Sequence, residues 1–259
     1  MQIKALLLII LFCIPVSAHI TINFPESDVT KIGNAIWRNE CGQKVTGLIS
    51  WNVGEAWPSL GIGHFIWYPQ GTHGIYQQSF DKLLLFLQKN KVVLPSWLIT
   101  AARTGAPWPD RETFLAVRAT DERIIQLQTI FESTITLQAH FIINQFKKQI
   151  HKLLAKHPAY TRLVNQLAQT PEGLFAMIDY SNCKGYGTNP QEQYNGQGWG
   201  LLQVLHAMDI KNKSDQVEAF IKAAQQVLEN RVKNAPPERH EERWLLGWKN
   251  RINRYTNPW

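Results

Sequence analysis

The chain has 259 residues, of which 44% are hydrophobic and ten are tryptophan, so it can bury one large core or two closely packed lobes. Its formal charge of +7 suits an anionic partner such as a cell-wall polymer, a membrane surface or nucleic acid. Nucleic acid is disfavoured, because the sequence has no compact run of Lys and Arg and no aromatic RNA-binding signature.

Residues 1–18 have the pattern of a secretory signal peptide. Lys4 supplies a positive charge, residues 5–16 form an apolar run, and Val16-Ser17-Ala18 offers the small residues that a signal peptidase reads. The run is too short to span a bilayer comfortably, so we expect it to be removed rather than to anchor the protein. The sequence therefore predicts a mature chain of residues 19–259 that is periplasmic or secreted, with no stable membrane insertion.

Loss of the signal peptide removes Cys13 and leaves Cys41 and Cys183. Two cysteines in an oxidising compartment are a candidate disulfide. The alternative is a pair of buried free thiols, because a sequence does not give the distance between them.

The predicted elements are one helix, a short β region and then helices almost to the end of the chain. The first helix, over 28–38, is capped by Ser27 or Asp28 and ends before Gly42. Residues 45–68 interleave β-forming residues with glycines, which is typical of short strands and tight turns. Later helices are predicted after Ser79, and over 111 onward, 133–156, 171 onward, 214–234 and 241–254. This order predicts a mostly helical α+β fold, in which a small β-hairpin lobe (about 40–75) packs on a larger helical lobe (about 76–259).

Glu40 stands where the first helix gives way to the β region, among the apolar Trp37, Trp51 and Trp57. Burial among these rings is expected to raise the pKa of its carboxyl group. A carboxylic acid that stays protonated can donate a proton to a glycosidic oxygen. The hairpin that follows can carry partner groups back over this acid, and its polar candidates are Asn52, Glu55 and Ser59.

The order of Glu40, a polar hairpin and then Ser59-Leu60-Gly61-Ile62-Gly63-His64 resembles the start of phage-type lysozymes and endolysins. The resemblance implies a lysozyme-like catalytic domain with Glu40 as the general acid and Ser59 at the position of a threonine hydroxyl. His64 would close the turn, and it is a candidate substrate contact. The Asp of that family falls on Val53 here, so the second role passes to Glu55 as a base or to Asn52 as a group that orients water.

Later segments resemble the same family in the same order. Phe175 to Asn182 is similar to its helix ending in an aromatic-Asn pattern, and Trp248 to Arg254 is similar to its arginine-rich final helix. The resemblance implies a peptidoglycan hydrolase that cleaves the β-1,4 bond between N-acetylmuramic acid and N-acetylglucosamine with inversion at the anomeric carbon. We expect a monomer whose partner is the glycan strand and which needs no cofactor and no metal.

A second resemblance concerns Gly196-Gln197-Gly198-Trp199-Gly200-Leu201-Leu202-Gln203-Val204, which is similar to a signature of goose-type lysozymes and lytic transglycosylases. The alternative interpretation is a tight glycine-rich turn that packs Trp199 against a helix. In either case the segment would line the cleft, which makes Tyr194, Gln197 and Gln203 candidate substrate contacts.

Three other functions remain open at this point, and a fourth is disfavoured. A lytic transglycosylase needs only one carboxylate, and a lysozyme scaffold can also serve as a non-catalytic peptidoglycan-binding protein. A cysteine peptidase would pair Cys41 with His64. A metallopeptidase is disfavoured because His240-Glu241-Glu242 lacks a second histidine at helical spacing.

Trp51, Trp57 and Trp67 are possible sugar platforms, and a solvated basic face is expected from Arg231, Lys233, Arg239 and Arg243.

Overall fold

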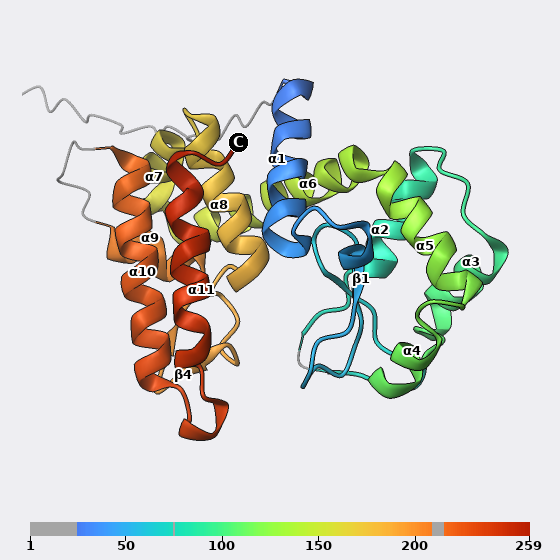
Figure 1. The fold of residues 1–259 in the computed structure, drawn as a ribbon. Helices are drawn as coiled ribbons and strands as arrows, with labels where there is room; N and C mark the ends of the chain where they lie inside the picture. The colour runs from blue at the N-terminus through green and yellow to red at the C-terminus, as the bar shows by residue number, and fades with distance from the viewer. Residues whose placement is uncertain (1–24, 75, 209–214) are drawn as a thin grey trace, which may run out of the picture.

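The computed structural model describes residues 25–74, 76–208 and 215–259 (Figure 1). The predicted signal peptide, its cleavage site and the start of the mature chain lie outside these ranges. Among the described residues, none of the helices has the length and apolar character that crossing a bilayer requires.

Helix α1 spans Glu26–Cys41 and places Glu40 and Cys41 in its last turn. Its buried face includes Val29, Ile32 and Ile36, at the helical spacing seen in the sequence. The helix ends as expected at Gly42, whose left-handed φ of 59° closes the C-terminal turn. It begins two residues earlier than predicted, and no side chain caps it, because the chain enters through the extended Pro25.

The β region is a three-stranded antiparallel sheet in the order β1-β2-β3, preceded by the 3-10 helix η1 (Val45–Leu48). Its strands are β1 (Ile49–Ser50), β2 (Ser59–Leu60) and β3 (Phe65–Ile66). Ser50 pairs with Ser59, and Leu60 pairs with Phe65. The prediction of short strands and tight turns is confirmed, and the sheet brings the loop of Asn52 and Glu55 beside the Gly-Ile-Gly-His turn.

A second hairpin, β4 (Gln193–Tyr194) and β5 (Gln197–Gly198), was not predicted as a pair of strands. Its two-residue turn is Asn195-Gly196, and both residues have positive φ, 49° and 76°. Asn-Gly is the preferred pair for such a turn, because its backbone twist matches that of the two strands.

The helices divide between two sides of the molecule (Figure 1). Helices α2 (Phe80–Lys89), α3 (Ser96–Thr104), α4 (Arg111–Val117) and α5 (Glu122–Ser133) lie on the side of the sheet. The long α6 (Ile135–Lys156) runs from this side to the other. On that other side it packs on α8 (Pro171–Lys184) and the short η2 (Pro158–Tyr160). The same side holds α7 (Thr161–Leu167), α9 (Leu201–Ala207), α10 (Gln216–Asn234) and α11 (Glu242–Ile252), with the short η3 (Pro237–Arg239) and η4 (Asn253–Thr256).

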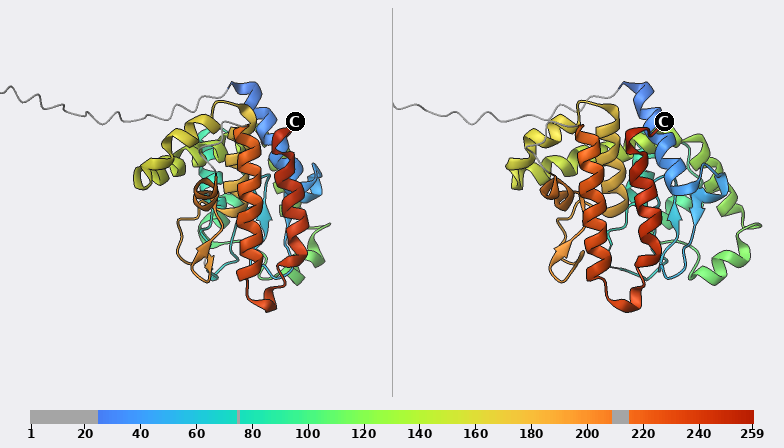
Figure 2. Two further views of the ribbon diagram at one scale, coloured as in Figure 1. Left: turned by 90° about the vertical axis from the view of Figure 1, so that its left-hand side faces the viewer. Right: turned by 60° about the vertical axis from the view of Figure 1, so that its left-hand side comes forward.

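Helix α1 packs on α6 at the junction of the two sides. Gly33 allows the close approach, since a Cβ there would lie 2.8 Å from the Cβ of Ala139. Helices α10 and α11 run side by side in all three views, and the C-terminus lies near α1 (Figure 2). A hydrogen bond from Arg38 to the carbonyl of Pro258 fixes that end. The observed fold is a mostly helical α+β structure, as predicted, and it brings the end of α1, the sheet and α11 together.

Candidate active site

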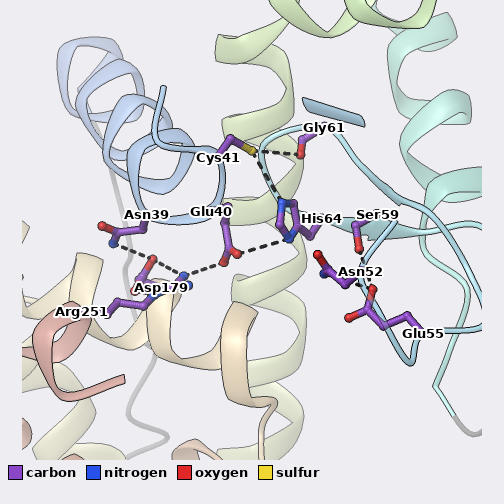
Figure 3. Close-up of polar contacts among 10 residues, drawn as sticks. All are labelled: Asn39, Glu40, Cys41, Asn52, Glu55, Ser59, Gly61, His64, Asp179 and Arg251. Atoms are coloured by element: carbon purple, nitrogen blue, oxygen red, sulfur yellow. Dashed lines mark hydrogen bonds and ion pairs between the residues drawn. The ribbon is translucent and has the colours of Figure 1, made fainter. Parts of the chain in front are cut away.

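Glu40 lies at the junction of α1, the sheet and α11, with its side chain 11% exposed (Figure 3). One carboxylate oxygen, Oε1, accepts a 2.6 Å hydrogen bond from Nη2 of Arg251 on α11. The other, Oε2, is 3.5 Å from Nδ1 of His64 in the turn after β2. The two oxygens of Glu40 therefore face opposite walls of the site.

A buried carboxylate, Asp179 of α8, holds Arg251 in place. Its two oxygens accept hydrogen bonds of 2.8 Å from Nε and Nη2 of Arg251, and this bidentate ion pair fixes the plane of the guanidinium group. Tyr255 donates a third hydrogen bond of 2.8 Å, and the Asn39 amide a weaker one of 3.3 Å. Because Asp179 is fully buried, these contacts are what make its charge tolerable, and they tie α8, α11 and α1 together.

The pKa of Glu40 is lowered, which makes the expectation of a raised pKa wrong. Burial does raise the pKa of this carboxyl group, and it is the largest single effect. The positive charges of Arg251 and His64, the hydrogen bond from Arg251 and the charge of Lys184 together outweigh burial. The apolar neighbours in the sequence predict a raised pKa, whereas Arg251, a cation from the end of the chain, reaches the same carboxylate.

The Gly-Ile-Gly-His turn is held by a fully buried amide, Gln138 of α6. Its Oε1 accepts a 2.9 Å hydrogen bond from the backbone N–H of Ile62, while its Nε2 donates to the carbonyl of Phe131. Gly61 has a φ of 66°, and a Cβ there would lie 2.3 Å from Oε1 of Gln138, so only glycine fits. His64 also has a positive φ, 47°, and this backbone conformation goes with an imidazole placed between Glu40 and Cys41.

Cys41 completes a chain of three titratable groups, with its Sγ 3.7 Å from Nε2 of His64. Its thiol also donates to the carbonyl of Gly61 at 4.0 Å. Burial raises the pKa of this thiol to about 12, and the neighbouring charge of Glu40 adds to the effect. The thiol is therefore neutral at physiological pH, although a cysteine, a histidine and a carboxylate lie in line.

The candidate disulfide is not formed in the structure, where Cys41 and Cys183 are both free, as in the alternative interpretation. The Cys41 thiol faces the turn of Gly61 and His64. Cys183 lies in the last turn of α8 and lines a small cavity with Trp248 and other residues of α10 and α11. The two thiols therefore face different surroundings.

Glu55, Asn52 and Ser59 form one hydrogen-bonded group on the sheet side, as Figure 3 shows beyond His64. Oε2 of Glu55 accepts from Nδ2 of Asn52 at 3.2 Å and from the hydroxyl of Ser59 at 3.4 Å. Trp51 donates its Nε1–H to the backbone carbonyl of Glu55 at 2.8 Å, which fixes the loop. Glu55 is half-buried and Ser59 is 3% exposed, while Val53 points to solvent and is 83% exposed.

The three candidate contacts in the second hairpin and in α9 have partners of their own. The Gln203 side chain is hydrogen-bonded to the backbone at both ends: its Oε1 accepts from the N–H of Gly200, and its Nε2 donates to the carbonyl of Gly187. The hydroxyl of Tyr194 donates to Glu241 at 2.8 Å. The exposed Gln197 accepts from Asn234 at 3.3 Å. The contacts described for these residues join the hairpin to α9, α10 and α11 and do not connect it with Glu40.

The prediction that Arg231 belongs to a solvated basic face is wrong. This side chain is 13% exposed, and it makes two hydrogen bonds, of 2.7 and 2.8 Å, with the fully buried carboxylate of Glu241. Its guanidinium also lies 4.0 Å from the ring centre of Trp199. Exposed side chains at this end of the molecule are those of Lys233, Arg239 and Arg243.

Two of the three candidate sugar platforms belong to the core. Trp51 is 5% exposed and Trp67 is fully buried against Phe80 and Trp108, so neither presents a free face. Trp57 is half-buried and packs edge-on against Tyr68 and Tyr76. It is the only one of the three with a surface that a sugar can reach.

Two central residues of the site, Asp179 and Arg251, were not named as site residues from the sequence. Both stand in segments that resemble the later helices of phage-type lysozymes, which was the one available signal. Within the described residues, no group of three or more His, Cys, Asp and Glu side chains is arranged to hold a metal ion.

Comparisons of the chain with protein-family models, with curated proteins and with solved structures find no match.

Proposed function

We propose that this protein is an exported glycoside hydrolase that cleaves the β-1,4 bond between N-acetylmuramic acid and N-acetylglucosamine in peptidoglycan, with Glu40 as the proton donor. The observation that carries the proposal is the setting of Glu40. It is a largely buried carboxyl group with one oxygen against Arg251 and the other against His64, opposite a loop that carries a second carboxylate. A donor and a second carboxylate are the groups that this hydrolysis requires.

In this proposal Arg251 and His64 act on the carboxylate that remains once Glu40 has given up its proton. Both stabilise the negative charge that develops on Glu40, which makes the protonated form a stronger acid. The same interactions leave fewer molecules protonated at neutral pH. Cleavage is therefore expected to speed up as the pH falls from neutral towards the lowered pKa of Glu40.

Asp179 prevents Arg251 from acting as an isolated cation. It already neutralises the guanidinium through two hydrogen bonds, so protonation of Glu40 leaves a neutral Asp179–Arg251 pair in the protein interior. Protonation of Glu40 therefore leaves no unpaired cation in the protein interior.

Glu55 is the proposed base for the attacking water. Asn52 and Ser59 share its Oε2, which leaves Oε1 without a hydrogen bond in the described contacts and available to a water molecule. The basic composition of the chain suits an anionic wall polymer, and the predicted signal peptide supports a location outside the cytoplasm.

The test is a digest of purified sacculi by the protein without residues 1–18, with the released fragments weighed by mass spectrometry. Fragments with hydrated reducing ends are expected from the wild type and are absent for Glu40→Gln. Glu132→Gln, which alters an exposed glutamate on α5, is the matched control and should release fragments at the wild-type rate. Equal release by Glu40→Gln and the control would overturn the assignment.

The same digest separates the alternatives within this class. Anhydro ends would identify a lytic transglycosylase and would remove the role given to Glu55. Binding to sacculi without any release would indicate a non-catalytic wall-binding protein.

The contact of Cys41 with His64 favours a second candidate, a cysteine peptidase. A nucleophilic cysteine must reach the thiolate form, and such cysteines have lowered pKa values in electropositive, accessible surroundings. Cys41 is buried at the C-terminal end of α1 beside Glu40, and its pKa is raised to about 12. The geometry is present, but the electrostatics oppose it, so we place the chemistry on Glu40.

A further inference from the structure

A lysine beside the site has a charge that the structure leaves unmatched. Lys184 is the last residue of α8, and its half-buried side chain places Nζ 3.5 Å from the ring centre of Trp248. Trp248 stands one turn before Arg251 on α11, which puts both on the face that meets α8. Lys184 is close enough to Glu40 for its charge to lower the pKa of that carboxyl group.

Each arginine near Lys184 has its own carboxylate. Asp179 and Glu40 pair with Arg251, and Glu241 pairs with Arg231. No carboxylate of the described chain lies within 4.0 Å of the Lys184 amine, whose close contact is instead the ring face of Trp248. A cation withdrawn from water without a counter-ion is costly, and the cation–π contact offsets only part of that cost.

The charged and titratable groups around the amine, together with its burial, disfavour its charged form. Burial lowers the pKa of Lys184 to about 8, with further lowering by Arg231 and Arg251, while Cys183 and Glu241 act in the opposite direction. An added carboxylate would relieve this cost, because it supplies the missing opposite charge.

We propose that Lys184, positioned by Trp248, binds a carboxylate of the substrate next to the bond that Glu40 protonates. This inference rests on the proposed function and adds a specificity to it. The substrate would be a glycan that carries carboxylates, as distinct from a neutral polymer of N-acetylglucosamine such as chitin. In peptidoglycan the carboxylate is supplied by the peptide stem, or by the lactyl group of muramic acid where the stem has been removed.

The test compares the wild type with Lys184→Gln and Lys184→Arg on three insoluble ligands. These are intact sacculi, glycan strands stripped of their peptides by an amidase, and chitin. Binding is measured by pelleting in the cold, so that it does not depend on cleavage, and KM and kcat are measured on the first two ligands. Lys222→Gln, an exposed lysine on α10, is the matched control, and thermal melts show that every variant is folded.

Removal of the charge is expected to weaken binding and to raise KM about tenfold on at least one peptidoglycan ligand, the size of one charge-assisted hydrogen bond. Lys184→Arg should restore most of the loss, and the change on chitin should be smaller. A loss on intact sacculi alone assigns the carboxylate to the peptide stem, and a loss on stripped strands assigns it to the lactyl group.

Two outcomes would overturn the inference, and they separate it from the proposed function. If the wild type binds and cleaves sacculi but Lys184→Gln matches the Lys222→Gln control, only the carboxylate site is wrong. If the wild type neither binds nor cleaves any ligand, the proposed function fails and the carboxylate site fails with it.

Discussion

Replacement of Arg251 by methionine tests the buried network that joins the two sides of the molecule. Met has nearly the length of Arg but no charge and no donor. The substitution removes the hydrogen bonds to Asp179 and Glu40, and it leaves Asp179 fully buried with only Tyr255 and Asn39 as partners. A buried carboxylate that loses its cation is among the most destabilising changes in a protein interior.

The expected loss is about 3 to 5 kcal/mol in the free energy of unfolding, since one partner of a buried, well-hydrogen-bonded ion pair is removed. With a slope of about 3 kcal/mol per molar urea for a chain of this size, the urea midpoint should fall by about 1 M or more. The double variant with Asp179→Asn removes the stranded charge as well and should recover at least half of the loss.

Urea unfolding, followed by circular dichroism, measures the free energy of unfolding of the wild type, Arg251→Met and the double variant under the same conditions. Arg254→Met is the matched control, because Arg254 is exposed in η4 and its replacement should change the free energy of unfolding by about 0.5 kcal/mol or less. If Arg251→Met is as stable as this control, the network does not hold α1, α8 and α11 together, and the structural role given to Arg251 and Asp179 is wrong.

Three further predictions concern charge and thiol chemistry. His64→Asn keeps a residue that tolerates positive φ but removes a charge that lowers the pKa of Glu40, so the pH at which cleavage falls to half should rise. The hydrogen bonds of Asp121 to Arg123, with that from Trp108, hold the pKa of Asp121 at about 2, below 3.8. Stability from this group is present above pH 3.8 and is lost as the pH falls towards 2, so Asp121→Asn should remove part of that acid dependence in urea titrations, about 1 kcal/mol because solvent screens the ion pair. Thiol titration of the protein without residues 1–18 should find two free thiols after denaturation and almost no reaction of Cys41 in the folded state at pH 7; a count of zero would restore the disulfide.

The local features of this site could be predicted from the sequence. The helix that ends at Gly42 and the glycine-rich turn before His64 both follow from residues close together in the chain, and these placed Glu40 beside the sheet. The Asn195-Gly196 turn carried an equally local signal that the sequence interpretation did not use.

The electrostatics could not be predicted in the same way. Arg251 is 211 residues from Glu40 in the chain, and its approach depends on where the folded chain places α11 relative to α8 and α1, which its hydrogen bonds to Asp179 and Glu40 join. Without that cation, burial alone predicts a raised pKa for Glu40, which has the wrong sign. Arg231 and Gln203 show the same limit, because each appears in the sequence as a polar residue free to face solvent or substrate and is instead satisfied within the fold.

The contiguous Cys41, His64 and Glu40 can be read as a thiol or as a carboxylic acid mechanism, and one measurement decides between them. Fragment release from sacculi is measured side by side for the wild type, Cys41→Ala and Glu40→Gln. The account predicts that Cys41→Ala keeps release within about threefold of the wild type, while Glu40→Gln loses about 10²- to 10⁴-fold, the contribution expected of a general acid. Release that survives in Glu40→Gln and disappears in Cys41→Ala would contradict it.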